Sequence, residues 1–174
     1  MFYPSISTLF SGIRAKLVIC TLLLTGCSAL PQKNIYTSID INAPRQVVWD
    51  ILADNDAYGD WNPYHVSVSG DLREGERLAV RIEKPNGTKV AIEPHVMRLL
   101  PLEELTWGGG IRGIFYGEHV FELSSIGKGK TRLIQRETFS GLAIPFAELD
   151  AIEEGYSLMN VALKQRAESM IDEP

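Results

Sequence analysis

Apolar and polar side chains alternate along much of the chain, and this alternation predicts β-strands. In residues 35–41 the three isoleucines, Ile35, Ile39 and Ile41, fall on one face, as in a half-buried strand. The same period of two returns in residues 66–68, 78–82, 90–96, 105–107, 115–123 and 131–139. Asn86-Gly87 separates two of these runs, and both residues tolerate the positive φ angles of a tight hairpin. The strands are therefore expected to pair antiparallel.

Two stretches have helical spacing instead. Val48, Ile51 and Leu52 predict a short helix with Pro44 in its first turn. A second stretch opens at Pro145 and predicts an amphipathic helix of about seven turns. Its apolar positions are Phe146, Leu149, Ile152, Tyr156, Met159, Leu163 and Met170. Only the sheet is long enough to cover this stripe, so we expect an α+β fold, a curved antiparallel sheet wrapped around a long C-terminal helix.

The first 26 residues have the features of a bacterial lipoprotein signal peptide. Arg14 and Lys16 precede a short apolar run, residues 17–24, which is too short to span a membrane. Leu24-Thr25-Gly26-Cys27 resembles the lipobox, in which the cysteine receives a diacylglyceryl group and becomes the first mature residue. The alternative is a plain signal peptide or uncleaved anchor, in which Cys27 is incidental. The expected organisation is a signal over residues 1–26, a lipidated tether over 27–34 and a folded domain over 35–174.

A lipid on Cys27 would place the protein in the bacterial cell envelope, anchored to the membrane through acyl chains. More than one chain is needed for stable anchoring, and diacylation or triacylation supplies them. Ser28 follows the cysteine, whereas an aspartate at this position would favour retention in the inner membrane. In a Gram-negative host we therefore expect an outer-membrane protein that faces the periplasm.

Composition excludes several classes of protein. The 174 residues amount to one domain, and the formal net charge of −5 without a Lys/Arg run argues against a nucleic-acid partner. Two cysteines and three scattered histidines give no disulfide scaffold and no metal site. Residues 108–113 satisfy G-x-G-x-x-G, but another predicted strand follows where a dinucleotide site needs a helix. We expect a mobile hairpin loop there, and no cofactor.

Five short motifs resemble the SRPBCC or START-like superfamily, which includes the polyketide cyclases and dehydrases. They are Ile39–Pro44, Val47–Leu52, Tyr58–Tyr64, Gly117–Phe121 and Arg136–Gly141. Their order and spacing match the superfamily over residues 35–171. The resemblance implies a helix-grip fold with an apolar tunnel between the sheet and the C-terminal helix.

Two polar side chains are expected to point into that tunnel. His119 shares strand parity with Phe121, and Glu137 shares parity with Phe139. If their strands pair through the turn at residues 127–129, the imidazole and the carboxylate meet on the cavity wall. A nearby carboxylate would raise the histidine pKa and suit general acid–base chemistry, although a buried structural pair is the simpler interpretation. The full set of candidate ligand contacts is Trp61, Asn62, Trp107, His119, Phe121, Glu137 and Tyr156.

Three functions remain open from the sequence. The first is a membrane-tethered binding domain that holds a small hydrophobic molecule, such as a lipid, a quinone or a polyketide-like compound. The second is a cyclase or dehydratase-type enzyme that uses His119 and Glu137. The third is an interaction or envelope-assembly lipoprotein with a filled, inert interior. A cavity of several hundred Å³ would support the first two, and a packed interior would support the third. The sequence does not define the oligomeric state.

Overall fold

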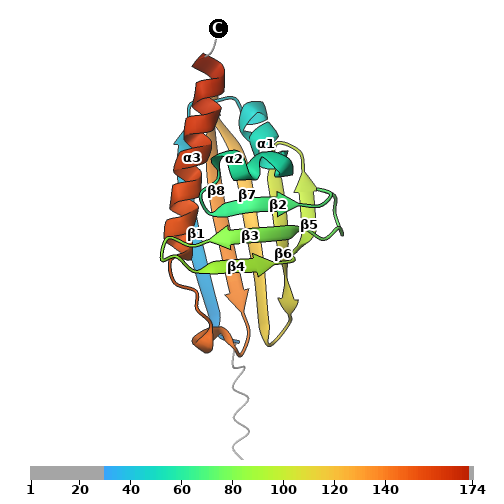
Figure 1. The fold of residues 1–174 in the computed structure, drawn as a ribbon. Coiled ribbons are helices and arrows are strands. Elements are labelled where there is room, and N and C mark those ends of the chain that lie inside the picture. Colours follow the sequence, from blue (N-terminus) through green and yellow to red (C-terminus); the bar gives the residue numbers. More distant parts are fainter. Residues whose placement is uncertain (1–29, 173–174) are drawn as a thin grey trace, which may run out of the picture.

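Two antiparallel sheets and a long helix make up residues 30–172, which the computed structural model describes (Figure 1). The larger sheet has the order β1 (Gln32–Ile41), β8 (Lys130–Ser140), β7 (Phe115–Gly127), β6 (Glu104–Ile111), β5 (His95–Leu100). The smaller sheet contains β2 (His65–Ser69), β3 (Ala79–Glu83) and β4 (Lys89–Ile92). The helical elements are α1 (Arg45–Ala53), η1 (Asn55–Ala57), α2 (Tyr58–Trp61), η2 (Ile144–Phe146) and α3 (Ile152–Asp172). The predicted α+β architecture, with an antiparallel sheet and a C-terminal helix, is confirmed.

The strands form two sheets, where the sequence predicted a single curved one. The smaller sheet crosses in front of the larger one (Figure 1). Residues 90–96 appeared continuous in the sequence, but β4 ends at Ile92 and Val96 pairs with Trp107 in the larger sheet. Pro94 lies at the division, and a proline has no N–H to donate to a strand ladder. The segment before β3 is linked to β5 by an isolated bridge from Arg77 to His95 and by the hydrogen bond from Val96 N to Glu76 O at 2.9 Å.

The hairpin predicted at Asn86-Gly87 is confirmed. It connects β3 and β4 with Val80 opposite Ile92, and Gly87 has a φ of 85°. The hairpin loop predicted over residues 108–113 is confirmed only at its end: residues 112 and 113 lie in the β6–β7 turn, whereas residues 108–110 lie within β6. A Cβ on Gly110 would collide with the carbonyl of Phe115 on the neighbouring strand. Gly110 therefore allows close approach of two strands.

The C-terminal helix is shorter than its spacing predicted. α3 begins at Ile152, which leaves 21 residues, or about six turns. Pro145 lies in the 3₁₀ turn η2, and Ala151 has a φ of 60°, which is incompatible with a continuous α-helix. Phe146 is 89% exposed and belongs to no buried stripe. The buried face of α3 consists of Ile152, Gly155, Tyr156, Met159, Asn160, Leu163 and Ala167.

Gly155 is the position where α3 approaches the ring of Tyr64. A Cβ at this position would lie closer than van der Waals contact to three Tyr64 ring atoms. Gly155→Ala should therefore destabilise the fold by about 1 to 2 kcal/mol, because overpacking outweighs the helix propensity that alanine usually gains. Urea denaturation of this variant beside Ser157→Ala, on the exposed face, measures the difference. A Gly155→Ala protein as stable as wild type would contradict the packing.

The predicted signal peptide and Cys27 lie outside the described residues. β1 begins at Gln32, so the last three residues of the predicted tether, 32–34, are part of the sheet. Within residues 30–172, no helix has the length and hydropathy needed to cross a bilayer.

Candidate functional site

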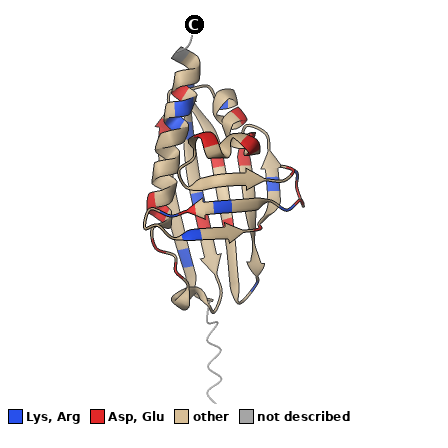
Figure 2. Ribbon diagram, viewed as in Figure 1, with Lys and Arg blue, Asp and Glu red and all other residues tan. Residues whose placement is uncertain are grey.

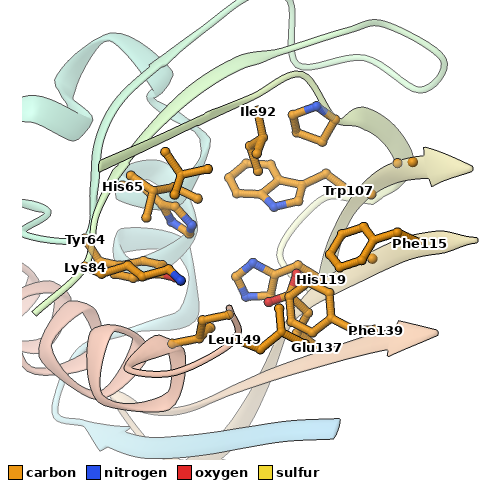
Figure 3. Close-up of a pocket in the computed structure, with 18 of the residues that line it drawn as sticks. Tyr64, His65, Lys84, Ile92, Trp107, Phe115, His119, Glu137, Phe139 and Leu149 are labelled. Atoms are coloured by element: carbon orange, nitrogen blue, oxygen red, sulfur yellow. The ribbon is translucent and has the colours of Figure 1, made fainter. Parts of the chain in front are cut away.

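A cavity of about 390 Å³ lies between the two sheets and the start of α3 (Figure 3). This volume falls within the range of small-molecule sites, roughly 300 to 1,000 Å³. Its wall is mostly apolar and aromatic, with a few polar groups. Residues of the wall include Ile82, Ile92, Trp107, Phe115, Phe139 and Ile152. The structure therefore lacks the filled interior that the third hypothesis requires.

Three neighbouring strands place a row of polar and aromatic side chains on the cavity wall. Trp107 on β6 pairs with His119 on β7, and His119 pairs with Glu137 on β8. All three line the cavity, and Figure 3 shows them facing a common space. Residues directly opposite on paired strands point to the same face. The inward orientation predicted for His119 and Glu137 is thus confirmed.

His119 is hydrogen-bonded to Gln135, not to Glu137 as the sequence suggested. Its Nε2 lies 3.0 Å from Gln135 Oε1, and Gln135 Nε2 donates to Asn160 Oδ1 at 2.7 Å. Asn160 Nδ2 in turn donates to Thr37 Oγ1 at 3.0 Å. Because the amide oxygen of Gln135 accepts, His119 carries its proton on Nε2 and leaves Nδ1 as an acceptor.

The predicted rise in the His119 pKa is wrong. Burial lowers the pKa of His119 well below its usual value, and the nearby ring of His65 lowers it further. The His65 and His119 ring centroids are 5.7 Å apart. His119 also stacks on Tyr156 with a centroid separation of 4.4 Å. The ring is therefore neutral near pH 7, held by Gln135 on one edge and Tyr156 on one face.

His65 is a cavity residue that the alternation did not reveal. Val66 and Val68 suggested a regular strand, in which His65 would face outward. A bulge instead places His65 opposite Ile82 and Ser67 opposite Arg81, so Val66 is an extra residue. His65 and Val68 consequently both point inward, and His65 is 2% exposed.

The ring of His65 lines the cavity, and one of its nitrogen atoms forms no hydrogen bond within the described residues. Nδ1 is buried and has no hydrogen-bond partner among residues 30–172. Burial lowers the pKa of His65 to about 3, so the ring is neutral. A buried polar atom without a partner costs about 1 to 3 kcal/mol.

Glu137 forms the second polar group of the wall, together with Tyr156 on α3. The Tyr156 hydroxyl donates to Glu137 Oε2. Burial raises the pKa of Glu137 to about 7, and the hydrogen bond from Tyr156 opposes that rise. Glu137 therefore changes charge near neutral pH, while Tyr156 stays protonated because burial also raises its pKa.

The raised pKa of Glu137 predicts a stability that falls with increasing pH. The folded protein holds this proton above the usual pKa of 4.5 and loses it near 7, so the destabilisation develops between those values. Glu137→Gln should remove it, and we expect stability relative to wild type to rise by about 3 kcal/mol from pH 4.5 to pH 8. Denaturation at both pH values, with exposed Glu154→Gln as the control, measures this. A pH-independent difference would contradict the burial of an ionising Glu137.

Four of the seven predicted ligand contacts line the cavity, namely Trp107, His119, Glu137 and Tyr156. Phe121 lies behind the wall, 1% exposed and 5.1 Å from the Trp107 ring centroid. Trp61 packs against Tyr58 on α2, with ring centroids 5.2 Å apart. Asn62 has a positioning role, since its Oδ1 accepts the backbone N–H groups of Tyr64 and His65. Trp61, Asn62 and Phe121 therefore do not line the cavity, and their predicted contact with a ligand stays a prediction.

Lys84 lines one side of the cavity, a position that the sequence analysis did not predict. Its side chain lines the cavity, is buried, and donates from Nζ to the carbonyl oxygen of Glu148 at 2.7 Å. Thr88 Oγ1 donates to Glu148 Oε1 at 3.1 Å. The β3–β4 hairpin thus holds the loop before α3 over the cavity. Lys84 continues the parity of Val80 and Ile82, and this was the sequence signal for its inward position, although a lysine usually points to solvent.

Comparison with known proteins gives a consistent family and fold. The family model described as "Polyketide cyclase / dehydrase and lipid transport" matches residues 32–168. No curated protein matches the chain. Similar solved structures include the Zhui aromatase/cyclase of Streptomyces sp. R1128, with a TM-score of 0.67 and 16% identity over 82% of this chain and 98% of that one.

Two further structures share the fold. A START superfamily protein of Mycobacterium smegmatis has a TM-score of 0.61 and 19% identity, over 79% of this chain and 98% of that one. A norcoclaurine synthase point mutant of Thalictrum flavum has a TM-score of 0.62 and 12% identity, over 83% of this chain and 99% of that one. At these identities the likeness establishes the fold, and function has to be argued from the cavity.

Proposed function

The chain belongs to the polyketide cyclase / dehydrase and lipid transport family, and from that premise we propose that it binds one small hydrophobic molecule in the cavity. The ligand class is a lipid, a quinone or a polyketide-like compound. Affinity comes from apolar burial against Trp107, Phe115 and Phe139. A hydroxyl group on the ligand donates to Nδ1 of His119.

The single observation that supports this proposal most is the cavity of about 390 Å³, whose wall is mostly apolar and aromatic. Nδ1 of His119, on this wall, is an acceptor position, since Nε2 is used by Gln135. A ligand hydroxyl can donate to this nitrogen.

Thermal unfolding tests the binding proposal. The full chain in mild nonionic detergent is heated with and without N-phenylnaphthylamine, a neutral apolar probe, and intrinsic fluorescence reports the midpoint. A ligand that binds only the folded state raises Tm, by an amount that grows with probe concentration. A midpoint that is independent of the probe would contradict an open apolar site.

A catalytic role is the second candidate, supported by Glu137 at the Tyr156 hydroxyl. A carboxyl group with a pKa of about 7 can both give and take a proton at neutral pH. His119, neutral and held by Gln135, would act as a hydrogen-bond acceptor. Glu137→Gln separates the two functions, because retained binding with lost conversion of a bound substrate supports catalysis. Unchanged conversion would exclude Glu137 as the acid or base.

We also propose that the domain is tethered to the outer membrane through acyl chains on Cys27. The basis is the apolar run that ends in Leu24-Thr25-Gly26-Cys27. Mass spectrometry of the N-terminal peptide from host membranes should show a cysteine with a diacylglyceryl group. An unmodified Cys27, or a chain that remains soluble, would contradict the tether.

A further inference from the structure

Five exposed apolar side chains gather at one end of the molecule, and we call this cluster the apolar pole. Phe146 is 89% exposed, Leu142 65% and Ile111 64%, which makes them the three most exposed large hydrophobic residues in the described chain. Ile114 and Leu30 complete the cluster, at 52% and 43%. Contiguous exposed apolar surface is uncommon on soluble domains and marks an interaction site.

Backbone hydrogen bonds tie the three segments of the apolar pole together. Leu142 N donates to Gly113 O at 3.0 Å, and Ala143 N donates to Ile114 O at 2.9 Å. Gly141 N donates to Pro31 O at 3.0 Å, which joins the start of the described chain to the same end. Figure 1 shows η2 and the β6–β7 turn at this end, opposite the C-terminal end of α3. The apolar side chains are therefore held on one fixed surface.

The charge pattern at the apolar pole differs from that of the whole chain. The chain has 22 acidic residues and a net charge of −5. Residues 30–35, 108–117 and 138–147 nevertheless contain no Asp or Glu, and their only charged residues are Lys33 and Arg112. In Figure 2, η2 and the β6–β7 turn themselves carry no acidic colour, and the nearest acidic residues after η2 are Glu148 and Asp150 in the loop to α3. Apolar tips with a few cations suit an anionic lipid surface.

We infer that the apolar pole docks on a lipid membrane. Only Ser28 and Ala29 separate Cys27 from Leu30, so an acyl chain on Cys27 would enter the bilayer within about 11 Å of Leu30. Ile111 and Ile114 directly adjoin Gly110 and Phe115, which line the cavity. Docking through the apolar pole would bring that part of the cavity wall to the membrane, where an apolar ligand is dissolved.

Photocrosslinking in the full chain tests the docking. Benzoylphenylalanine replaces Phe146 in one protein and Met170 in another; Met170 is 56% exposed and lies near the far end of α3. Each protein is irradiated in host membranes and in vesicles of phosphatidylethanolamine with phosphatidylglycerol. We expect phospholipid adducts from position 146 and only background from position 170. The inference would be overturned if the crosslinker at position 146 reacted only with proteins. Equal yields of lipid adducts at positions 146 and 170 would also overturn it.

A second pair of variants separates docking from tethering. Leu142→Glu, in the protein with the crosslinker at 146, should lower the lipid yield several-fold, whereas Val161→Glu on α3 should not. Both variants keep the Cys27 region, so acylation is read independently from the mass of the N-terminal peptide. They also keep the cavity wall, so the thermal shift by N-phenylnaphthylamine should remain. An unchanged lipid yield in Leu142→Glu would contradict docking through this surface.

Discussion

Gly109→Phe should abolish ligand binding while the domain stays folded. Gly109 has the strand parity of Trp107, and a Cβ placed on it would meet only Pro94 Cα at 3.7 Å and Glu93 O at 3.9 Å, which are ordinary contacts. Its φ is not in the left-handed region that favours glycine. The new ring would enter the cavity beside Trp107. We expect affinity for N-phenylnaphthylamine to fall by about 100-fold, or about 2.7 kcal/mol.

The measurement is the probe-induced shift in Tm, with Gly127→Phe as the matched control. Gly127 ends β7, and a Cβ there would meet nothing within 4 Å. At a probe concentration of 100 times the dissociation constant, wild type and the control should each gain about 8 °C. Gly109→Phe should gain almost nothing, and its own midpoint shows whether it is folded. A full shift in folded Gly109→Phe would place the binding site elsewhere.

Gln135→Leu should destabilise the protein by about 3 kcal/mol, because it leaves two buried polar groups without a partner. Gln135 is fully buried between His119 and Asn160, and it accepts from one and donates to the other. The exposed Gln46 bonds only Asp50 one turn along α1. Gln46→Leu is therefore the control, with an expected change within about 0.5 kcal/mol.

A double-mutant cycle checks that the loss comes from the hydrogen-bonded chain. Replacing both Gln135 and Asn160 by leucine removes the interaction as a unit, so the combined loss should be smaller than the sum of the single losses by about 1 kcal/mol or more. Strictly additive losses would show that the two amides are independent. Urea denaturation of the three variants and wild type gives the four free energies of unfolding.

Strand parity was sufficient to place His119 and Glu137, since side chains alternate strictly along an unbroken ladder. The same rule failed at His65, where one bulged residue reverses the parity of everything before it. The partner of His119 was also hidden. Gln135 has the same parity as Glu137, and Asn160 on a distant helix decides which of the two strand neighbours bonds to the ring.

The boundary of α3 shows a second limit of sequence patterns. Phe146 and Leu149 continue the helical spacing of Ile152 and Tyr156, yet the first is exposed and the second lines the cavity. Spacing records which residues are apolar, and it does not show where the backbone turns. The turn depends on long-range contacts, such as the one from Lys84 to Glu148, which the order of residues does not contain.

Native mass spectrometry of the protein extracted from its host tests most directly whether the cavity holds a hydrophobic molecule. Wild-type chain released from mild detergent should carry one small apolar compound in addition to any covalent lipid, and its mass identifies the chemical class. Gly109→Phe, prepared in the same way, should carry none. Wild-type protein that is empty in repeated extractions, or equal loading of both proteins, would contradict the account.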